Sequence, residues 1–355
     1  MFVRILYAVS LGIAILSIGS SCKKQMQEKV VQNDEQWIVS TLAGDGTPSL
    51  ADGPAANAQF HFPFDVAADF NGNIYVADVQ NHCIRKIAGG LVSVFAGGDL
   101  GIADGEGSAA KFRYPMSITV DAAGNLYTSD VTDPRIRKID PGGKVTTYAG
   151  SEEEGFADGA ADIARFGDES ALASDAEGNI YVADPQNNRI RKISPSRTVT
   201  TIAGNESSGF EDGQAGKARF NFPDGIAVDG QGNIFVADGL NSCIRKIDPQ
   251  GRVSTLAGTN KQGVEDGTGS SARFEYPTDM VIDREGNLFV LDLDRIRKIM
   301  PDGTVITIAG GLNGYQDGAG SVARFQTPAG LGMDAQGNIY VADTENNRIR
   351  RLSLK

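Results

Sequence analysis

The amino-acid sequence predicts an all-β protein, a six-bladed β-propeller that its own N-terminal strand closes. Three observations lead to this prediction: a segment related to GNIYVAD recurs six times, each copy contains four short β-rich runs, and the two ends of the repeated region complement each other. The copies begin at Gly72, Gly124, Gly178, Gly232, Gly286 and Gly337, so they are 51 to 54 residues apart. Repeated units of four antiparallel strands are typical of a propeller.

The fourth copy shows the predicted strands most clearly. GIAVD (225–229) and NIFVAD (233–238) are joined by a D-x-x-G-N turn, in which Gly and Asn tolerate the left-handed backbone that a tight hairpin requires. CIRKI (243–247) follows a polar turn, and a Pro-x-Gly turn then leads to VSTLAG (253–258). Each copy therefore predicts one four-stranded blade.

The two ends of the repeated region carry complementary pieces of one copy. IVSTLAG at 38–44 matches a fourth strand, although no first, second or third strand precedes it. The last residues, RIRRLSLK at 348–355, match a third strand that no fourth strand follows. We therefore expect the N-terminal strand to complete the last blade and to leave no open sheet edge in the ring.

The strings GNIYVADxxNNRIRKI and PxGIAVD resemble NHL repeats, and the resemblance covers residues 37–355. It implies a propeller of the kind that serves as a binding platform in many proteins. Related six-bladed propellers also include metal-dependent lyases and lactonases. The fold alone therefore does not decide the function.

The N-terminal segment predicts export and anchoring. Arg4 precedes an apolar stretch at 5–18, which is too short to span a bilayer and has the length of a signal-peptide core. The segment resembles a bacterial lipoprotein signal, with Gly19 where leucine is usual, and this implies a signal peptide at 1–21 and a lipidated Cys22. The alternative is an ordinary secretory signal. Residues 22–36 are expected to form the lipidated cysteine and a flexible tether, which would place the propeller in the cell envelope, at the outer membrane, with the lipid as its only membrane contact.

The charge of the chain argues against one class of partner. The formal net charge is −12, so the protein repels the phosphate backbone, and we expect no nucleic-acid partner. This charge and the predicted export also oppose an RNA-binding NHL domain.

Two charged positions recur in every copy. Aspartate ends the second strand and arginine lies on the third, and we interpret both columns as turn capping and pairing within each blade, because repetition favours a structural role. The alternative is an acidic ring that lines the channel. The columns are Asp78, Asp130, Asp184, Asp238, Asp292 and Asp343, and Arg85, Arg137, Arg191, Arg245, Arg297 and Arg350.

A long loop precedes each first strand and contains an Asp-Gly pair with a phenylalanine eight residues after the aspartate. We expect the loop to be a compact turn that inserts the phenylalanine between neighbouring blades. A calcium loop is the weaker alternative, because Asp-Gly alone lacks alternating acidic ligands, and we expect no cofactor other than this calcium. The phenylalanines are Phe60, Phe112, Phe166, Phe220, Phe274 and Phe325.

The copies differ at the start of the first strand, on the face where loops meet the channel, so ligand-binding candidates are sought there. Asp65, Glu169, Asp224 and Asp279 would form an acidic mouth, with Phe64 and Met116 as an apolar shelf. The alternative is that these are solvated loop residues. The two histidines, His61 and His82, are also ligand-binding candidates, with a single-histidine acid or base role and plain loop residues as the alternatives. Both belong to the first copy, so they cannot supply the histidines from several blades that zinc lyases of related architecture use.

The function expected from these features is a noncatalytic binding or scaffold propeller that engages a peptide, glycan or protein through one face. The alternative is a lactonase-type or lyase-type enzyme with a divalent cation held by acidic residues at the channel. Cys83 and Cys243 occupy equivalent positions in the first and fourth copies, which lie on opposite sides of a six-membered ring, so both thiols are expected to be free.

Overall fold

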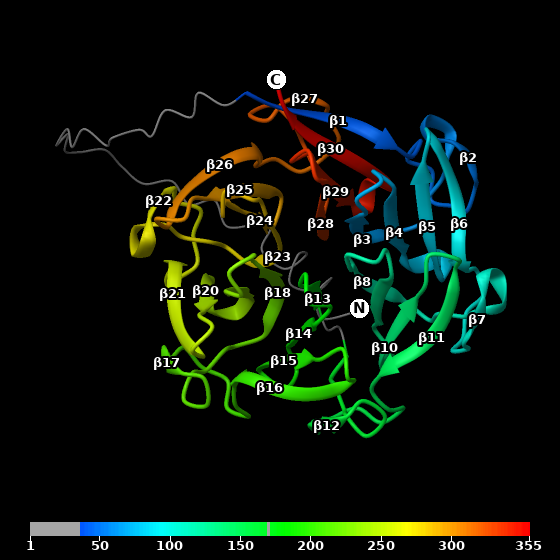
Figure 1. The fold of residues 1–355 in the computed structure, drawn as a ribbon. Coiled ribbons are helices and arrows are strands. Elements are labelled where there is room, and N and C mark those ends of the chain that lie inside the picture. Colours follow the sequence, from blue (N-terminus) through cyan, green and yellow to red (C-terminus); the bar gives the residue numbers. More distant parts are fainter. Residues whose placement is uncertain (1–35, 169–170) are drawn as a thin grey trace, which may run out of the picture.

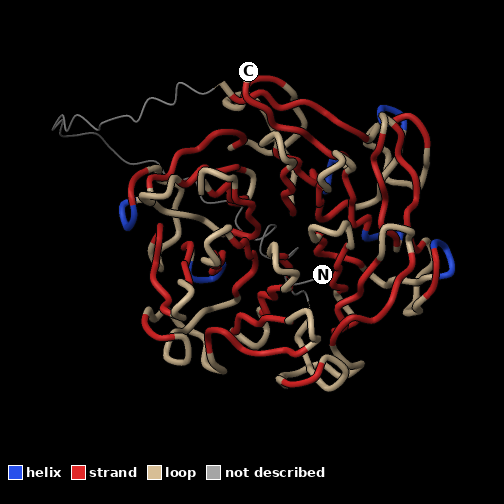
Figure 2. Tube along the Cα trace, viewed as in Figure 1, coloured by secondary structure: helices blue, strands red, loops and turns tan. Residues whose placement is uncertain are grey.

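The computed structural model describes residues 36–168 and 171–355. They form six five-stranded sheets arranged around a central axis, as Figure 1 shows. Almost all regular structure is strand, and short helical turns connect some of the strands (Figure 2). The predicted six-bladed propeller is confirmed.

The strands of the first three blades have a common order from the axis outward. Blade 1 contains β3 (Pro63–Ala68), β4 (Ile74–Asp78), β5 (Cys83–Ala88), β6 (Leu91–Gly97) and β2 (Gly53–Pro54). Blade 2 contains β8 (Pro115–Val120), β9 (Leu126–Asp130), β10 (Asp133–Ile139), β11 (Lys144–Ala149) and β7 (Gly105–Glu106). Blade 3 contains β13 (Ala171–Ser174), β14 (Ile180–Asp184), β15 (Arg189–Ile193), β16 (Thr198–Gly204) and β12 (Gly159–Ala160).

The other three blades follow the same order. Blade 4 contains β18 (Pro223–Val228), β19 (Ile234–Asp238), β20 (Cys243–Ile247), β21 (Arg252–Gly258) and β17 (Gly213–Gln214). Blade 5 contains β23 (Pro277–Ile282), β24 (Leu288–Asp292), β25 (Arg295–Ile299), β26 (Thr304–Gly310) and β22 (Gly267–Thr268). Blade 6 contains β28 (Gly330–Met333), β29 (Ile339–Asp343), β30 (Arg348–Leu354), β1 (Trp37–Ala43) and β27 (Gly318–Ala319).

Six short 3-10 turns lie in the described residues and fall into two groups. Three follow two-residue outer strands: η1 (Ala55–Asn57), η3 (Gly107–Ala109) and η5 (Gly269–Ser271). Three join a second strand to a third strand: η2 (Val79–Asn81), η4 (Gly239–Asn241) and η6 (Thr344–Asn346). None of the described helices is long and apolar enough to cross a membrane. Cys22 and the predicted signal and tether lie outside the described residues, except for Gln36.

The first strand of the chain closes the ring, as predicted. β1 pairs antiparallel with β30, from Trp37 opposite Leu354 to Ala43 opposite Ile349, and Figure 1 shows the two strands side by side. The Trp37 side chain is buried, and its ring packs edge-on against Phe289 of blade 5 with 5.5 Å between the ring centres. The N-terminal strand therefore joins the last blade to its neighbour as well as completing it.

The six loop phenylalanines form the apolar contacts between blades, as expected. Phe220 is fully buried in one cluster with Ala183 and Ile190 of blade 3 and Val236 of blade 4. Burying such a side chain stabilises the fold by about 1.5–3 kcal/mol. All six are buried to the same extent: Phe60, Phe112, Phe166, Phe220, Phe274 and Phe325.

The repeated aspartate and arginine columns are structural, which confirms the interpretation from the sequence. Buried Arg245 binds Asp238 at 2.7 Å, and it also binds Asp212, the aspartate of the Asp-Gly pair, at 2.7 Å. The sequence did not predict this second partner. In blade 2, Arg137 pairs with Asp104, and Asp130 accepts backbone N–H bonds. The other blades repeat the triad: Arg85 with Asp52 and Asp78, Arg191 with Asp158 and Asp184, Arg297 with Asp266 and Asp292, and Arg350 with Asp317 and Asp343.

Cys83 and Cys243 are free, as predicted, and both are also fully buried. Cys83 lies opposite Gly97 and Cys243 lies opposite Gly258, which is the place that Arg189 takes opposite Gly204 in blade 3. Burial raises the pKa of both thiols well above the ordinary value. They therefore act as small core residues rather than as reactive groups.

Candidate functional site

One face of the propeller gathers the loops that precede the first strands and the turns that join second and third strands. In blade 1, Pro63 at the start of β3 pairs with Asp78 at the end of β4. The Asn81 side chain in the following turn donates to the Ser49 carbonyl of the long loop at 3.0 Å. We call this side, with residues 44–62 and 78–83 and their equivalents in the other blades, the pocket face.

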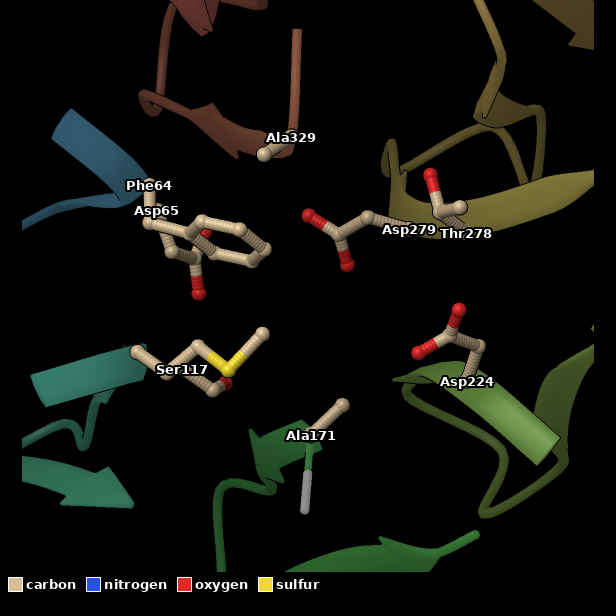
Figure 3. A pocket seen from close by; sticks show the side chains of 9 residues that line it. Phe64, Asp65, Ser117, Ala171, Asp224, Thr278, Asp279 and Ala329 are labelled. Carbon is tan, nitrogen blue, oxygen red and sulfur yellow. The ribbon is translucent and has the colours of Figure 1, made fainter. Parts of the chain in front are cut away.

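An opening of about 260 Å³ lies on the axis at the pocket face, where the six first strands begin. Figure 3 shows the Phe64 ring and the Asp279 carboxylate extending into it from blades 1 and 5. This volume includes space open to solvent, so the opening is a shallow depression rather than an enclosed cavity. The described lining residues are Phe64, Asp65, Met116, Ser117, Ala171, Asp224, Thr278, Asp279 and Ala329.

Five of the eight predicted ligand-binding residues therefore meet in one place: Phe64, Asp65, Met116, Asp224 and Asp279. Glu169 lies outside the described residues. Sequence reasoning missed Ser117, Ala171, Thr278 and Ala329, although each occupies a repeat position equivalent to that of a predicted residue. The alignment of the copies at the two positions after the strand proline contains all four residues, so the signal is present in the sequence.

Two positions follow the proline that begins the first strand of blade 1, and Phe64 and Asp65 occupy them. Small residues at the equivalent of the second position allow the first strands of neighbouring blades to approach closely. A side-chain carbon at Gly330 would lie 2.4 Å from Asp65 Oδ1 and 2.6 Å from the Phe64 carbonyl oxygen. A side-chain carbon at Gly225 would meet the backbone of Thr278 and Asp279 in the same way. The strands therefore pack side by side around the axis.

Polar side chains at the same position bond from one blade to the next. Asp65 Oδ2 accepts the Ile118 N–H at 2.8 Å, which links blade 1 to blade 2. Ser117 Oγ accepts the Leu172 N–H at 3.1 Å across the next junction. Asp279 Oδ2 accepts the Leu331 N–H at 2.7 Å between blades 5 and 6. These side chains hold the inner ring together and line the opening at the same time.

The carboxylates are more buried than loop residues would be. Asp65 is 8% exposed and Asp224 is 0% exposed, so the alternative that they are solvated is wrong for both. Burial and the negative charge of Asp279 raise the pKa of Asp65 well above its ordinary value. No lysine, arginine or histidine is present among the described residues that line the opening. The site is therefore acidic and lacks a compensating cation in its lining.

The predicted apolar shelf divides into two parts. Met116 is 2% exposed and packs into the wall, whereas the partly exposed Phe64 ring reaches the opening. A ligand at the opening would therefore meet one aromatic surface beside the carboxylates.

Neither histidine is part of the described lining. The backbone N–H of His61 donates to Asp78 Oδ1 at 2.8 Å. His82 Nδ1 contacts the Arg113 carbonyl oxygen, and its ring packs edge-on against Tyr114 at 5.4 Å. The structure thus gives neither side chain a place beside the opening.

Within residues 36–168 and 171–355, no three or more His, Cys, Asp or Glu side chains converge in a group that could hold a metal ion. The three carboxylates in the described lining come from different blades, and two of them accept backbone N–H groups. The arrangement is better suited to contacting a ligand than to enclosing a cation with several oxygen ligands.

Comparison with known families identifies the repeats. Residues 60–87 and 325–352 match the NHL repeat, and residues 200–273 match the teneurin NHL domain. Protein SUPPRESSOR OF QUENCHING 1, chloroplastic, from Arabidopsis thaliana is 28% identical, over 90% of this chain and 32% of its own length. NHL repeat-containing protein 2 from Bos taurus is 29% identical, over 88% of this chain and 42% of its own length. The chain spans less than half of each relative.

Solved structures share the fold at low sequence identity. An auxiliary nutrient binding protein from Bacteroides ovatus superposes with a TM-score of 0.67 and 17% identity, over 91% of this chain and 78% of that one. A gluconolactonase from Xanthomonas campestris superposes with a TM-score of 0.60 and 13% identity, over 91% of this chain and 96% of that one. A protein of unknown function from Bacteroides thetaiotaomicron superposes with a TM-score of 0.69 and 21% identity, over 91% of this chain and 77% of that one. Binding proteins and enzymes therefore share this architecture.

Proposed function

Because this chain is a six-bladed β-propeller built of NHL repeats, we propose that it is a noncatalytic binding or scaffold protein. Its pocket face engages a peptide, glycan or protein partner, with the opening on the axis at the centre of the contact. The lipid on Cys22 holds the propeller at the outer membrane of the cell envelope. The fold likeness to an auxiliary nutrient binding protein supports this class of function.

One observation carries the proposal: blades that share their structural residues differ at the lining of the opening. Five blades repeat the same buried Asp-Arg-Asp triad. At the position after the strand proline, by contrast, the described lining residues are Phe64, Met116, Asp224, Thr278 and Ala329. A packing requirement common to all blades would select one kind of residue here, so this variety favours recognition of an asymmetric ligand.

The rival is a metal-dependent lactonase or lyase, which the fold likeness to a gluconolactonase and the three carboxylates of the opening favour. Such an enzyme needs converging oxygen ligands and an acid or base. Two of the carboxylates are engaged by neighbouring backbone N–H groups, and neither histidine is in the described lining. The binding function therefore fits the site better.

A thermal-shift screen of the full chain against oligosaccharides and peptides tests the proposal. A ligand that raises the melting temperature of the wild-type protein should lose its effect with Phe64→Ala. Phe70→Ala is the matched control, because Phe70 is a 70% exposed aromatic residue in the hairpin turn at the other end of the same strand. Ligands that stabilise Phe64→Ala and wild type equally, or turnover of a lactone that Asp224→Asn abolishes, would overturn the proposal.

A further inference from the structure

Two neighbouring loops of the pocket face differ from the other four. They are SEEEGFAD (151–158) and NESSGFED (205–212), which together contain seven acidic residues and no lysine or arginine. Each also contains a phenylalanine, Phe156 or Phe210, that is 44% or 39% exposed. We call these two loops the acidic rim. The equivalent loops elsewhere have a leucine, isoleucine, valine or tyrosine at this position and fewer acidic residues.

The two loops lie next to each other around blade 3. Arg189, at the start of β15, pairs with Gly204, from which the second loop departs. The guanidinium of the same residue stacks on the Phe156 ring of the first loop at 3.8 Å. Arg189 thus contacts the first loop through its side chain and pairs with the residue from which the second loop departs, so both loops lie at the same end of blade 3.

Part of the acidity of the rim is already neutralised. Asp158 and Asp212 belong to the buried arginine triads. Glu153 binds Arg165 at 2.6 Å, and Glu211 binds Arg219 at 2.9 Å.

The remaining glutamates leave a net negative charge. Glu152 makes one contact of 3.4 Å with Arg135, whose guanidinium is held more closely by Asp133 at 2.7 Å. Glu154 and Glu206 are exposed and form no ion pair with a described residue. Three exposed carboxylates therefore remain available on the rim.

Each of the two phenylalanine rings packs on a buried arginine and is also partly exposed to solvent. Phe156 covers Arg191 at 4.8 Å, and Phe210 covers Arg245 at 5.1 Å. Aliphatic residues at this position in other blades show that covering the arginine does not require an aromatic ring. The ring adds exposed aromatic surface, which attracts cations and apolar side chains.

We propose that the acidic rim is the docking surface for a basic polypeptide segment that presents lysine or arginine together with apolar side chains. This inference rests on the proposed function of the pocket face and names the class of partner. Complementary charge selects it: exposed carboxylates attract cationic side chains and repel anionic lipids and nucleic acids. The exposed rings provide apolar contact and cation–π interaction, which a neutral glycan would use less fully.

The test measures binding of a synthetic ten-residue peptide of alternating arginine and leucine to the full chain by fluorescence anisotropy. The peptide should bind more tightly than its glutamate-leucine counterpart, and its affinity should fall as salt is added. Glu152→Gln/Glu154→Gln/Glu206→Gln should weaken binding about tenfold, because it removes three exposed charge pairs that each contribute modestly. Phe156→Leu/Phe210→Leu, which keeps the arginines covered, should weaken it about tenfold as well.

Glu177→Gln/Glu285→Gln/Asp302→Asn is the matched control, because it removes the same number of charges from exposed turns at the opposite face. Equal weakening by this control would show a response to net charge alone and would overturn the inference. Equal binding of the acidic peptide would also overturn it. If the basic peptide does not bind but Phe64→Ala still removes a ligand found by screening, the inference fails while the proposed function stands.

Discussion

Replacing Trp37 with alanine tests how much the side-chain packing of β1 contributes to ring closure. The indole is 4% exposed and packs against Phe289 of the neighbouring blade. The backbone of Trp37 stays in place in this variant, including the carbonyl that accepts the Gly320 N–H at 2.8 Å. The side-chain contacts of the indole are lost, among them its packing against Phe289 of blade 5.

Truncating a buried Trp to Ala costs about 3–5 kcal/mol. The unfolding entropy of a domain of this length is on the order of 0.7 kcal/mol per kelvin, so the melting temperature should fall by about 4–7 °C. Differential scanning calorimetry of the full chain measures this fall. Phe70→Ala is the control, since that side chain is 70% exposed and should leave the melting temperature within about 1 °C. A Trp37→Ala protein that melts at the same temperature as the control would refute the contribution of the indole packing to ring closure.

Three further predictions concern the cysteines and the inner ring. Cys22→Ser should release the protein from the membrane fraction, and unchanged fractionation would show that Cys22 carries no anchor. Cys83 and Cys243 should react with an alkylating agent only after unfolding, because both are fully buried, and a mass that shows a bridge between them would contradict the blade register. The raised pKa of Asp65 means that the folded state binds the proton more tightly than the unfolded chain does, so the free energy of unfolding should fall as pH rises above about 4. Asp65→Ser, which copies Ser117 of blade 2, should make this urea-unfolding profile flatter, and parallel profiles would refute the assignment.

The sequence was sufficient to predict the propeller because each blade repeats the same local signals. Turn residues, alternating apolar strands and the incomplete copies at both ends all indicate one closed ring. The buried Asp-Arg pairing was predicted for the same reason. The second partner of the arginine, the aspartate of the Asp-Gly pair, was not predicted. Asp212 and Arg245 are far apart in the sequence and meet only when the outer strand folds back.

The candidate site was less predictable than the fold. Sequence position placed Phe64, Asp65 and Asp224 at the mouth of the channel, but it could not distinguish exposed from buried carboxylates. That difference depends on how closely the first strands approach one another, and Gly225 and Gly330 leave room for the strands of the next blades. The histidines show that closeness in the sequence does not place a residue at the site. His61 is only three residues from Phe64, yet it is not part of the described lining.

The central claim is that the opening on the pocket face contacts a ligand without a metal ion, and calcium dependence of stability tests it most directly. A cation that binds only the folded state adds about 2.7 kcal/mol of stability at one hundred times its dissociation constant. The full chain should melt at the same temperature in excess calcium and in excess chelator. A calcium-dependent rise in the melting temperature that Asp224→Asn or Asp279→Asn abolishes would contradict the claim and favour the metal-dependent enzyme.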